Sequence, residues 1–408
     1  MKDNSKNSRI LIYSHDTFGL GHLRRCRAIA QSLVARRKGL SVLILSGSPI
    51  IGSFDYRSRV DFVRIPGVIK LRNGEYSSLS LHMDISELLE LRASIIQHTA
   101  KVFNPDLFLV DKEPLGLRGE IYQTLAMLRR AGTRCVLGLR DVMDDPVLLA
   151  REWRRKNPLP ALRKLYDDIW VYGLPQICNP LAGIDLPEAI KAKMTYTGYL
   201  RRKLPQITGQ SVASPCSFDE PYLLVTTGGG GDGEQLIHRV LRAYEVDPGI
   251  PYPAMLVFGP FMAPRRRERF CKRVERLSRV QAITFDTNVE QLMARAAGIV
   301  AMGGYNTFCE ILSLDKPALI VPRRRPRMEQ YIRAHRAHEL GLVTMLADDE
   351  ARTPHLMAAA LRRLPHQPRP SAVVVPGLLD GLDNIQRMVD AGMPAAFEPH
   401  VGLAARGV

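Results

Sequence analysis

The chain has 408 residues, and its 57 Lys and Arg residues outnumber its 41 Asp and Glu residues, which gives a formal net charge of +16. This length predicts two domains, and the sequence has neither an apolar run near the ~20 residues of a membrane span nor a secretory signal at its polar start. Only 7% of the residues are aromatic and no basic stretch alternates with them, which argues against a dedicated nucleic-acid-binding protein.

The first half of the chain has the pattern of a parallel sheet covered by helices. A strand at Arg9–Tyr13 leads into a glycine turn that contains Gly19 and Gly21 and ends at His22, and a helical spacing of apolar residues follows. The other expected strands are Ser41–Leu45, Asp61–Arg64, Leu107–Val110, Cys135–Leu139 and Ile169–Tyr172. Apolar strands that alternate with helices indicate a sheet buried on both faces. Residues 1–200 are therefore expected to form a Rossmann-like domain.

The second half repeats this design after an aperiodic segment. Residues 201–220 are rich in Pro, Gly, Gln and Ser and are expected to be an interdomain linker. The expected elements that follow are strand Tyr222–Thr226, glycine turn Gly228–Gly233, helix Glu234–Tyr244 and strands Ala254–Phe258, Gln281–Thr284, Gly298–Met302, Ala318–Val321 and Val343–Leu346. We expect a second Rossmann-like domain at 221–365 and a tail at 366–408 with a helix near Asn384–Val389. Two doubly wound α/β domains in tandem predict ligand binding at the carboxyl ends of their strands, across a cleft.

Two glycine-rich turns in the second half are candidate contacts for a phosphorylated ligand. Gly228, Gly229 and Gly230 let the backbone approach a ligand closely, although such a turn also serves simply to pack a strand against a helix. The run Gly303–Thr307 starts a second helix and offers free amides and hydroxyls to a diphosphate. Glu310, about one turn inside that helix, is placed to accept hydrogen bonds from ribose hydroxyls; its alternative role is to complement the helix dipole.

A histidine at the tip of the first glycine turn is the candidate general base. An imidazole pKa of about 6.5 suits the deprotonation of a hydroxyl, and we prefer His22 to the nearby His15, the alternative being a structural histidine at a helix start. Asp111 follows the strand Leu107–Val110 directly and is the first choice for the carboxylate that orients this base, with Asp141 as the second choice. Because the chain has no Asp-x-Asp motif, we expect helix amides and basic side chains to stabilise a leaving diphosphate without a metal ion.

Three segments of the second half resemble a known family. They are Gly303-Gly304-Tyr305-Asn306-Thr307-Phe308-Cys309-Glu310, Lys316-Pro317-Ala318-Leu319-Ile320-Val321-Pro322, and Glu329-Gln330-Tyr331 followed by Ala334, Leu340 and Gly341. They resemble the donor-binding half of the peptidoglycan lipid-linked N-acetylglucosaminyltransferase family and are similar to the nucleotide-sugar hydrolase of pseudaminic acid synthesis. The front motif, from Gly19 to Cys26, is closer to that hydrolase. The resemblance extends over about Arg9–Leu346.

The resemblance implies a GT-B fold, with the donor nucleotide on the C-terminal domain and the acceptor on the N-terminal one. His22 would lie at the reacting centre. The chain departs from the family pattern at Met302 and Gly303, where the family has basic or hydroxyl residues, and at Arg333, where it has Asn. The residues that would contact the donor are Glu310 at the ribose, Gln330 with Glu329 beside it at the sugar, the backbone near Phe285 and Asp286 at the base, and Gly303, Gly304, Asn306 and Thr307 at the diphosphate.

A run of arginines follows the strand Ala318–Val321. By the resemblance, Arg323, Arg324 and Arg325 lie beside the donor sugar. Arginine binds carboxylates and phosphates through two parallel hydrogen bonds, so we expect this loop to bind an anion rather than to be only a solvated surface. The anion would be a uronic-type sugar carboxylate or the phosphate of a lipid-linked acceptor. The positive charge would also favour peripheral contact with the inner face of the cell membrane.

Sugar transfer is the function that these residues favour. We expect transfer from a nucleotide diphosphate sugar, a UDP-sugar by the resemblance, to a hydroxyl acceptor that is lipid-linked or part of a cell-envelope polysaccharide, with no metal and no cofactor. The alternatives are a nucleotide-sugar hydrolase, in which water replaces the acceptor, a related epimerase, and a basic scaffold protein. The six cysteines are scattered singly, which indicates a reducing compartment and hence the cytoplasm.

Overall fold

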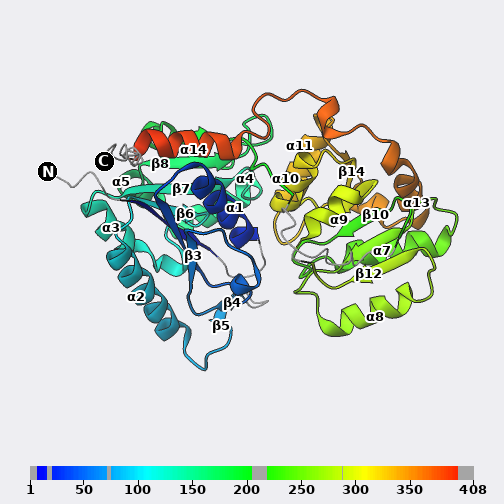
Figure 1. The fold of residues 1–408 in the computed structure, drawn as a ribbon, viewed down its shortest axis with the longest axis horizontal. Helices are drawn as coiled ribbons and strands as arrows, with labels where there is room; N and C mark the ends of the chain where they lie inside the picture. Colours follow the sequence, from blue (N-terminus) through cyan, green and yellow to red (C-terminus); the bar gives the residue numbers. More distant parts are fainter. Residues whose placement is uncertain (1–6, 16–20, 71–74, 205–217, 287, 394–408) are drawn as a thin grey trace, which may run out of the picture.

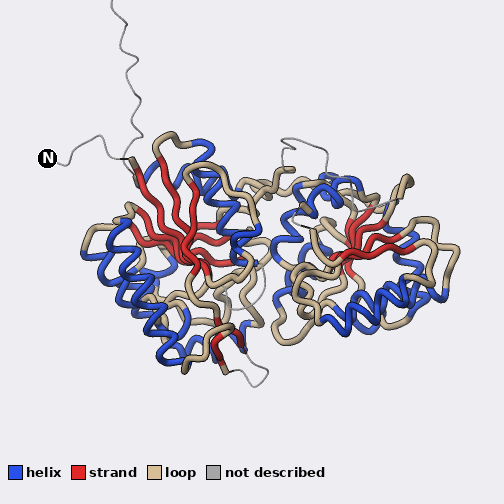
Figure 2. Tube along the Cα trace, turned by 60° about the horizontal axis from the view of Figure 1, so that its bottom comes forward, coloured by secondary structure: helices blue, strands red, loops and turns tan. Residues whose placement is uncertain are grey.

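Two α/β domains make up the described residues of the computed structural model, which are 7–15, 21–70, 75–204, 218–286 and 288–393. Each domain is built around one parallel sheet with helices on both faces, and the two lie side by side (Figure 1, Figure 2). Both features are expected of apolar strands that alternate with helices.

Seven parallel strands form the N-terminal sheet, in the order β3-β2-β1-β6-β7-β8-β9. Their bounds are β1 (Ser8–Ser14), β2 (Leu40–Ser46), β3 (Val60–Arg64), β6 (Leu107–Asp111), β7 (Arg134–Arg140), β8 (Asp168–Tyr172) and β9 (Met194–Tyr196). A separate antiparallel hairpin joins β4 (Val68–Lys70) to β5 (Tyr76–Ser78).

Six parallel strands form the C-terminal sheet, in the order β12-β11-β10-β13-β14-β15. Their bounds are β10 (Leu223–Thr226), β11 (Ala254–Val257), β12 (Val280–Ile283), β13 (Gly298–Ala301), β14 (Ala318–Ile320) and β15 (Thr344–Met345). In both sheets the chain order reverses beside the first strand, β1 or β10, and this switch point is where open α/β sheets bind ligands.

Fourteen α-helices surround the sheets in the described residues. Those of the first domain are α1 (Gly21–Arg36), α2 (Ile85–Phe103), α3 (Tyr122–Arg130), α4 (Pro146–Lys156), α5 (Leu159–Leu165) and α6 (Glu188–Lys191), joined by α14 (Gly381–Gly392). Those of the second domain are α7 (Glu234–Val246), α8 (Pro264–Val274), α9 (Val289–Arg295), α10 (Tyr305–Ser313), α11 (Glu329–Glu339), α12 (Asp348–Ala351) and α13 (Pro354–Arg363). Short 3-10 helices lie at Ile51–Ser53, Leu117–Gly119, Leu364–His366 and Pro370–Ala372.

One apolar cluster runs through both domains and defines how they meet. It contains Ile10 and Ile12 of β1, the buried face of α1, and residues of α10 such as Phe308. Across the interface the ring of Tyr199 lies 5.9 Å from that of Tyr305 and 5.1 Å from that of Phe308, measured between centroids. A second cluster fills the outer face of the N-terminal sheet, under α2 and α3. A third cluster fills the outer face of the C-terminal sheet, under α7 and α13. The two domains are thus in direct contact through buried apolar and aromatic side chains.

The tail helix α14 returns to the first domain and packs beside α1 (Figure 1). Arg37 donates to Asp390 at 2.8 Å, and Arg134 donates to the carbonyl of Met388 at 2.8 Å. The returning chain runs alongside the outgoing one, because Tyr199 donates its amide to the carbonyl of Leu378 at 2.8 Å. The chain therefore passes between the domains twice at one place.

The expected strands agree with the observed ones to within a residue or two at their ends, and the tail helix is longer than the expected Asn384–Val389. The hairpin β4–β5, the edge strand β9 and the return of α14 to the first domain were not expected from the sequence. Much of the expected linker, 205–217, lies outside the described residues.

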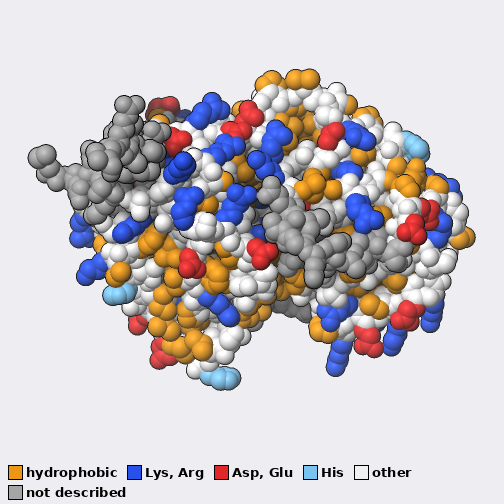
Figure 3. Space-filling model, viewed as in Figure 1, with side chains coloured by type: hydrophobic (Ala, Val, Ile, Leu, Met, Phe, Trp, Pro, Cys, Tyr) orange, Lys and Arg blue, Asp and Glu red, His pale blue; other side chains and the backbone are white. Residues whose placement is uncertain are grey.

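Charged side chains are spread over the surface of both domains. Lys and Arg side chains are scattered among Asp and Glu on the face drawn in Figure 3 rather than gathered into one patch. Within the residues that the structure describes, none of the helices has the length and apolar character needed to span a membrane.

Candidate active site

His22 and Asp111 lie together at the carboxyl edge of the N-terminal sheet. His22 is the second residue of α1, and Asp111 is the last residue of β6, which pairs with β1. The Nδ1 atom of His22 hydrogen-bonds Oδ2 of Asp111. The side chain of His22 remains 14% exposed, whereas that of Asp111 is 1% exposed. The structure thus brings the candidate base and its candidate orienting carboxylate into contact.

Arg25 fixes the position of this carboxylate. Its Nε donates to Oδ1 of Asp111 at 2.8 Å and its Nη2 to Oδ2 at 2.6 Å, while Nη2 also lies 3.2 Å from Nδ1 of His22. Positions i and i+3 of a helix share a face, so His22 and Arg25 reach the same aspartate. With Asp111 accepting a hydrogen bond from Nδ1–H, the lone pair of Nε2 of His22 is left to accept a proton.

Burial and charge set the protonation of these groups. Burial alone would raise the pKa of Asp111, but Arg25 and His22 hold it well below its usual range. Burial lowers the pKa of His22 against the opposing charge of Asp111, so the imidazole is mostly neutral at pH 7. Burial also lowers the pKa of His15 to about 3. The ring of His15 lies 5.8 Å from that of His22, and its Nδ1 atom is 3.5 Å from the hydroxyl of Tyr13.

Asp141 does not orient the base, because Arg333 of the other domain binds it. Arg333 Nε donates to Oδ2 of Asp141 at 2.7 Å and Nη2 donates to Oδ1 at 2.6 Å, and both side chains are fully buried. The hydroxyl of Tyr199 adds a third hydrogen bond to Asp141 at 2.7 Å. The second choice for the orienting carboxylate is therefore corrected. Arg333, the position that departs from the family pattern, joins the domains here and also donates to the carbonyl of Gly303 at 2.8 Å.

The two glycines before α10 have different reasons to be glycine. Gly303 has φ +79°, and a Cβ added there would lie 2.8 Å from Cγ2 of Ile320. Gly304 is the N-cap residue of α10 and provides no side-chain hydrogen bond to the helix. A Cβ added at Gly304 would meet no described atom within 4 Å. The fold therefore requires Gly303, whereas the space beside Gly304 is open in the described part of the chain.

Two candidate diphosphate and ribose contacts on α10 touch the first domain. Asn306 Nδ2 donates to the carbonyl of Gly21 at 3.0 Å, and its Oδ1 accepts from Arg202 at 2.7 Å. Glu310 is buried, with Oε1 2.8 Å from Nη2 of Arg24 but without hydrogen-bond geometry. Burial raises the pKa of Glu310 to about 7 despite the opposing charge of Arg24. Thr307, the remaining candidate on this helix, is also buried.

The other candidate donor contacts are arranged around the first turns of the second domain. Gly230 packs against the neighbouring strand end, where an added Cβ would lie 2.3 Å from the carbonyl of Phe258. At Gly228, with φ +67°, an added Cβ would meet no described atom within 4 Å, and Gly229 accepts from the amide of Phe261 at 2.9 Å. Phe285 packs with an apolar cluster that includes Leu23 and Phe54 of the first domain. Asp286 accepts from the amide of Asn288 at 2.7 Å.

The arginine run after β14 has partners within the protein. Arg323 donates to Asp232 and, at 2.8 Å, to Glu329. The guanidinium of Arg324 lies 4.4 Å from the ring centroid of Tyr331. Arg323 and Arg324 therefore have contacts within the protein, and the binding of an anion by this loop stays a prediction. The backbone amide of Arg323 also donates to Oε1 of Gln330 at 3.3 Å, which holds that candidate sugar contact beside the loop.

Two surface cavities lie on the second domain. The smaller, about 560 Å³, is lined by Arg323, Arg324 and Arg325 together with Met302 and Val321 at the ends of β13 and β14. The larger, about 1250 Å³, lies between α7 and α8 and is lined by none of the candidate site residues. The carboxyl edge of the C-terminal sheet is therefore accessible beside the arginine loop.

Sequence reasoning missed the roles of Arg24, Arg25 and Arg202. Arg24 and Arg25 stand in the front motif beside His22, so their position was a usable signal, whereas nothing local marks Arg202. Gly19 of the same motif lies outside the described residues. Within the described residues, no three His, Cys, Asp or Glu side chains are grouped so that they could hold a metal ion.

Comparison with known proteins gives a match in the second half of the chain. Residues 223–372 match the model of the glycosyltransferase family 28 C-terminal domain. The second domain is a family 28 glycosyltransferase domain. An uncharacterized glycosyltransferase of Methanosarcina mazei is 24% identical over 317 residues, which cover 74% of this chain and 77% of the relative. A second, from Methanosarcina acetivorans, is 24% identical over 313 residues with the same coverage.

Solved structures agree with this domain assignment at the level of the fold. The glycosyltransferase of kitacinnamycin superposes with a TM-score of 0.59 at 14% identity, covering 96% of this chain and 97% of that one. MurG of Acinetobacter baumannii superposes with a TM-score of 0.54 at 12% identity, covering 94% and 98%. The chain has the GT-B fold, and with its family 28 domain it is a glycosyltransferase of the GT-B type.

Proposed function

We propose that this glycosyltransferase moves a sugar from a nucleotide diphosphate sugar, a UDP-sugar, to a hydroxyl group of an acceptor, in the cytoplasm and without a metal ion or cofactor. One observation carries the proposal: the helix that bears the candidate base touches the candidate donor helix. Asn306 of α10 donates to the carbonyl of Gly21, the residue before His22, at 3.0 Å. A base and a donor held this close allow direct attack of an acceptor hydroxyl on the donor sugar.

His22 acts as the general base in this proposal. Its Nε2 atom takes the proton of the acceptor hydroxyl as the oxygen attacks the anomeric carbon. Asp111 accepts from Nδ1–H, keeps the imidazole in the required tautomer and stabilises the imidazolium that forms. Arg25 holds Asp111 ionised, so that the carboxylate is present throughout the reaction.

The amino end of α10 receives the leaving diphosphate. Its first amides have no side-chain cap, and the space beside Gly304 is open in the described residues. These amides and the helix dipole stabilise the negative charge that grows as the glycosidic bond breaks, which is the work that a divalent cation does in other enzymes. When the donor binds, the carboxylate of Glu310 leaves Arg24 and accepts hydrogen bonds from the ribose hydroxyls.

The acceptor is lipid-linked or part of a cell-envelope polysaccharide in this proposal. Arg324 and Arg325 are exposed beside the smaller cavity, which supports contact with an anionic substrate group or with anionic lipids at the inner face of the membrane.

A product analysis tests the proposed reaction. The purified chain is incubated with UDP-sugars, with and without lipid-linked and polysaccharide acceptors, and with and without excess EDTA. We expect sugar to be incorporated only when acceptor is present, at a rate that EDTA does not change. Equal release of free sugar from donor alone would identify a hydrolase. Loss of transfer with EDTA that magnesium or manganese restores would contradict the metal-free step.

A further inference from the structure

Arg140, the last residue of β7, has a half-buried side chain whose Nε atom is unpaired in the described part of the chain. Its Nε atom is buried and has no hydrogen-bond partner, and no carboxylate of the described residues lies within 4 Å of it. A buried donor without an acceptor is costly, and each such group in a native protein calls for an explanation. Burial lowers the pKa of Arg140 to about 10, with a further lowering from the nearby Arg25 and Arg333, so the group stays charged.

Lys112 is a second cation at the neighbouring strand end. It follows Asp111 directly, and its amide donates to the carbonyl of Gly138 in β7 at 2.8 Å. Its Nζ atom stands 3.8 Å from Oε1 of Glu113, beyond hydrogen-bond distance. Lys112 has φ +72°, a conformation that non-glycine residues adopt at a cost and that is concentrated at functional sites. Burial lowers the pKa of Lys112 to about 8, with Arg140 acting in the same direction.

Most carboxylates around these two cations are bound to other cations, and Glu113 is shared between Lys156 at 2.8 Å and Lys112 at 3.8 Å. The pairs are Asp111 with Arg25, Asp141 with Arg333, Glu113 with Lys156, Asp144 and Glu152 with Arg327, and Glu329 with Arg323. Of these carboxylates, Glu329 raises the pKa of Arg140 most strongly, yet no oxygen of Glu329 lies within ion-pair distance of Arg140, that is, within 4 Å. Within the described residues, the Nε–H group of Arg140 is thus left without an acceptor.

We propose that Lys112 and Arg140 form an anion subsite of the N-terminal domain, which binds a phosphate or carboxylate group of a substrate beside His22. The proposal deepens the proposed transferase function and rests on it. Arg140 offers a planar fork of donors that suits either anion, and Lys112 adds a point charge. Lys112 adjoins the aspartate that binds His22, so an anion held there would lie close to the reacting hydroxyl.

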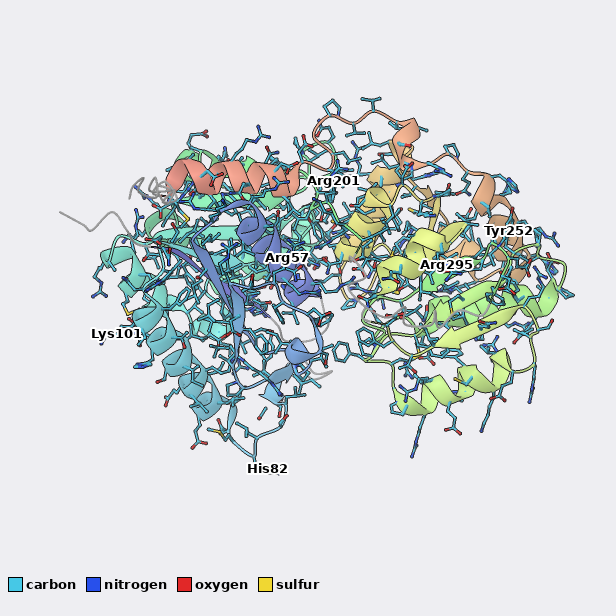
Figure 4. The ribbon with its side chains drawn as sticks, viewed as in Figure 1. Arg57, His82, Lys101, Arg201, Tyr252 and Arg295 are labelled. Atoms are coloured by element: carbon cyan, nitrogen blue, oxygen red, sulfur yellow. The ribbon has the colours of Figure 1, made fainter. Side chains whose placement is uncertain are left out.

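Affinity measurements on charge-removing variants test the subsite. Two pairs of probes are used: UDP is compared with uridine, and glucose 1-phosphate is compared with glucose in the presence of saturating UDP. Each probe is titrated calorimetrically into the wild type, Arg140→Gln, Lys112→Gln and the double variant. The matched controls are Arg130→Gln and Lys101→Gln, which remove exposed charges from α3 and α2; Lys101 lies on the side of the domain away from the interface (Figure 4). Arg140→Lys tests rescue by a conservative cation.

We expect Arg140→Gln to weaken the binding of the phosphorylated probe of one pair by about tenfold or more. The affinity for the uncharged probe, and the affinities of the control variants, should be unchanged. Loss for UDP would assign the subsite to the donor diphosphate, and loss for glucose 1-phosphate would assign it to the acceptor. The melting temperature should not fall, because Arg140 has no protein partner to lose. Unchanged affinity for both phosphorylated probes would overturn the subsite, whereas absence of UDP binding to the wild type would instead overturn the proposed function.

Discussion

Two buried carboxylates, Asp111 and Asp141, bind arginines near the domain interface, and the choice of partner decides what each carboxylate can do. Asp111 and Asp141 follow neighbouring strands, yet Arg25 leaves Asp111 in contact with His22 while Arg333 binds both oxygens of Asp141. The identity of the orienting aspartate is therefore set by arginine geometry rather than by strand position alone.

Replacing His22 by alanine should remove the base without removing the donor site. General bases contribute on the order of 10²–10⁴-fold to rate, so turnover should fall by that factor while UDP affinity stays close to that of the wild type. Steady-state kinetics and calorimetry measure the two quantities separately. His15→Ala is the control, and a larger loss of turnover for His15→Ala than for His22→Ala would show that His15 is the base.

The acid limb of the pH profile should report His22. Burial lowers its pKa from the usual 6.5, so the unprotonated base persists below that value and is lost only as the pH falls through the lowered pKa. We expect log kcat/KM to be level through neutral pH and to decline with a midpoint below 6.5. A midpoint above 6.5 would mean that Asp111 dominates over burial in the working enzyme.

At the scale of elements, the amino end of α10 is the part of the donor site that one substitution tests most sharply. Gly304→Ala places a methyl group where the described fold leaves open space, at a φ of −59° that alanine tolerates. We expect folding stability to change by less than about 1 kcal/mol, the usual size of a cap effect, and nucleoside diphosphate affinity to fall at least about tenfold.

Gly52→Ala is the matched control for this change, because its added Cβ would make an ordinary contact of 3.9 Å with Phe62. Thermal melts and calorimetric titration of both variants supply the comparison. A Gly304→Ala variant that binds every nucleoside diphosphate as well as the wild type would place the diphosphate elsewhere.

Local pattern was enough to predict the elements and part of the site. Runs such as Leu107–Val110 are recognisable because a strand buried on both faces is apolar throughout, and the strand-end argument then placed Asp111 near His22. Pairings between distant segments were not predictable in this way. Nothing near Arg333 or Arg24 in the sequence indicates that their partners are Asp141 and Glu310 of opposite domains, because charge pairing depends on the docking of two folded surfaces.

At the scale of the whole molecule, the fully buried pair of Arg333 and Asp141 joins the two domains. Arg333→Met leaves Asp141 buried without its cation and should cost about 3–5 kcal/mol of unfolding free energy. Adding Asp141→Leu should recover much of that loss, since the uncompensated charge is then gone. Denaturant melts of the single and double variants give the coupling energy.

The ion pair of Arg129 and Asp167 is the control for these two substitutions, because its side chains are 45% and 27% exposed. Arg129→Met should cost less than about 1 kcal/mol. Additive effects of Arg333→Met and Asp141→Leu would mean that the pair does not hold the interface together.

Calorimetric titration of nucleoside diphosphates into the wild-type chain tests the central claim most directly. A donor site formed by α10 and α11 of the family 28 domain should bind at least one nucleoside diphosphate saturably, with one site per chain, and Glu310→Gln should weaken that binding by about tenfold or more. The account is contradicted if no nucleoside diphosphate binds saturably to the folded chain.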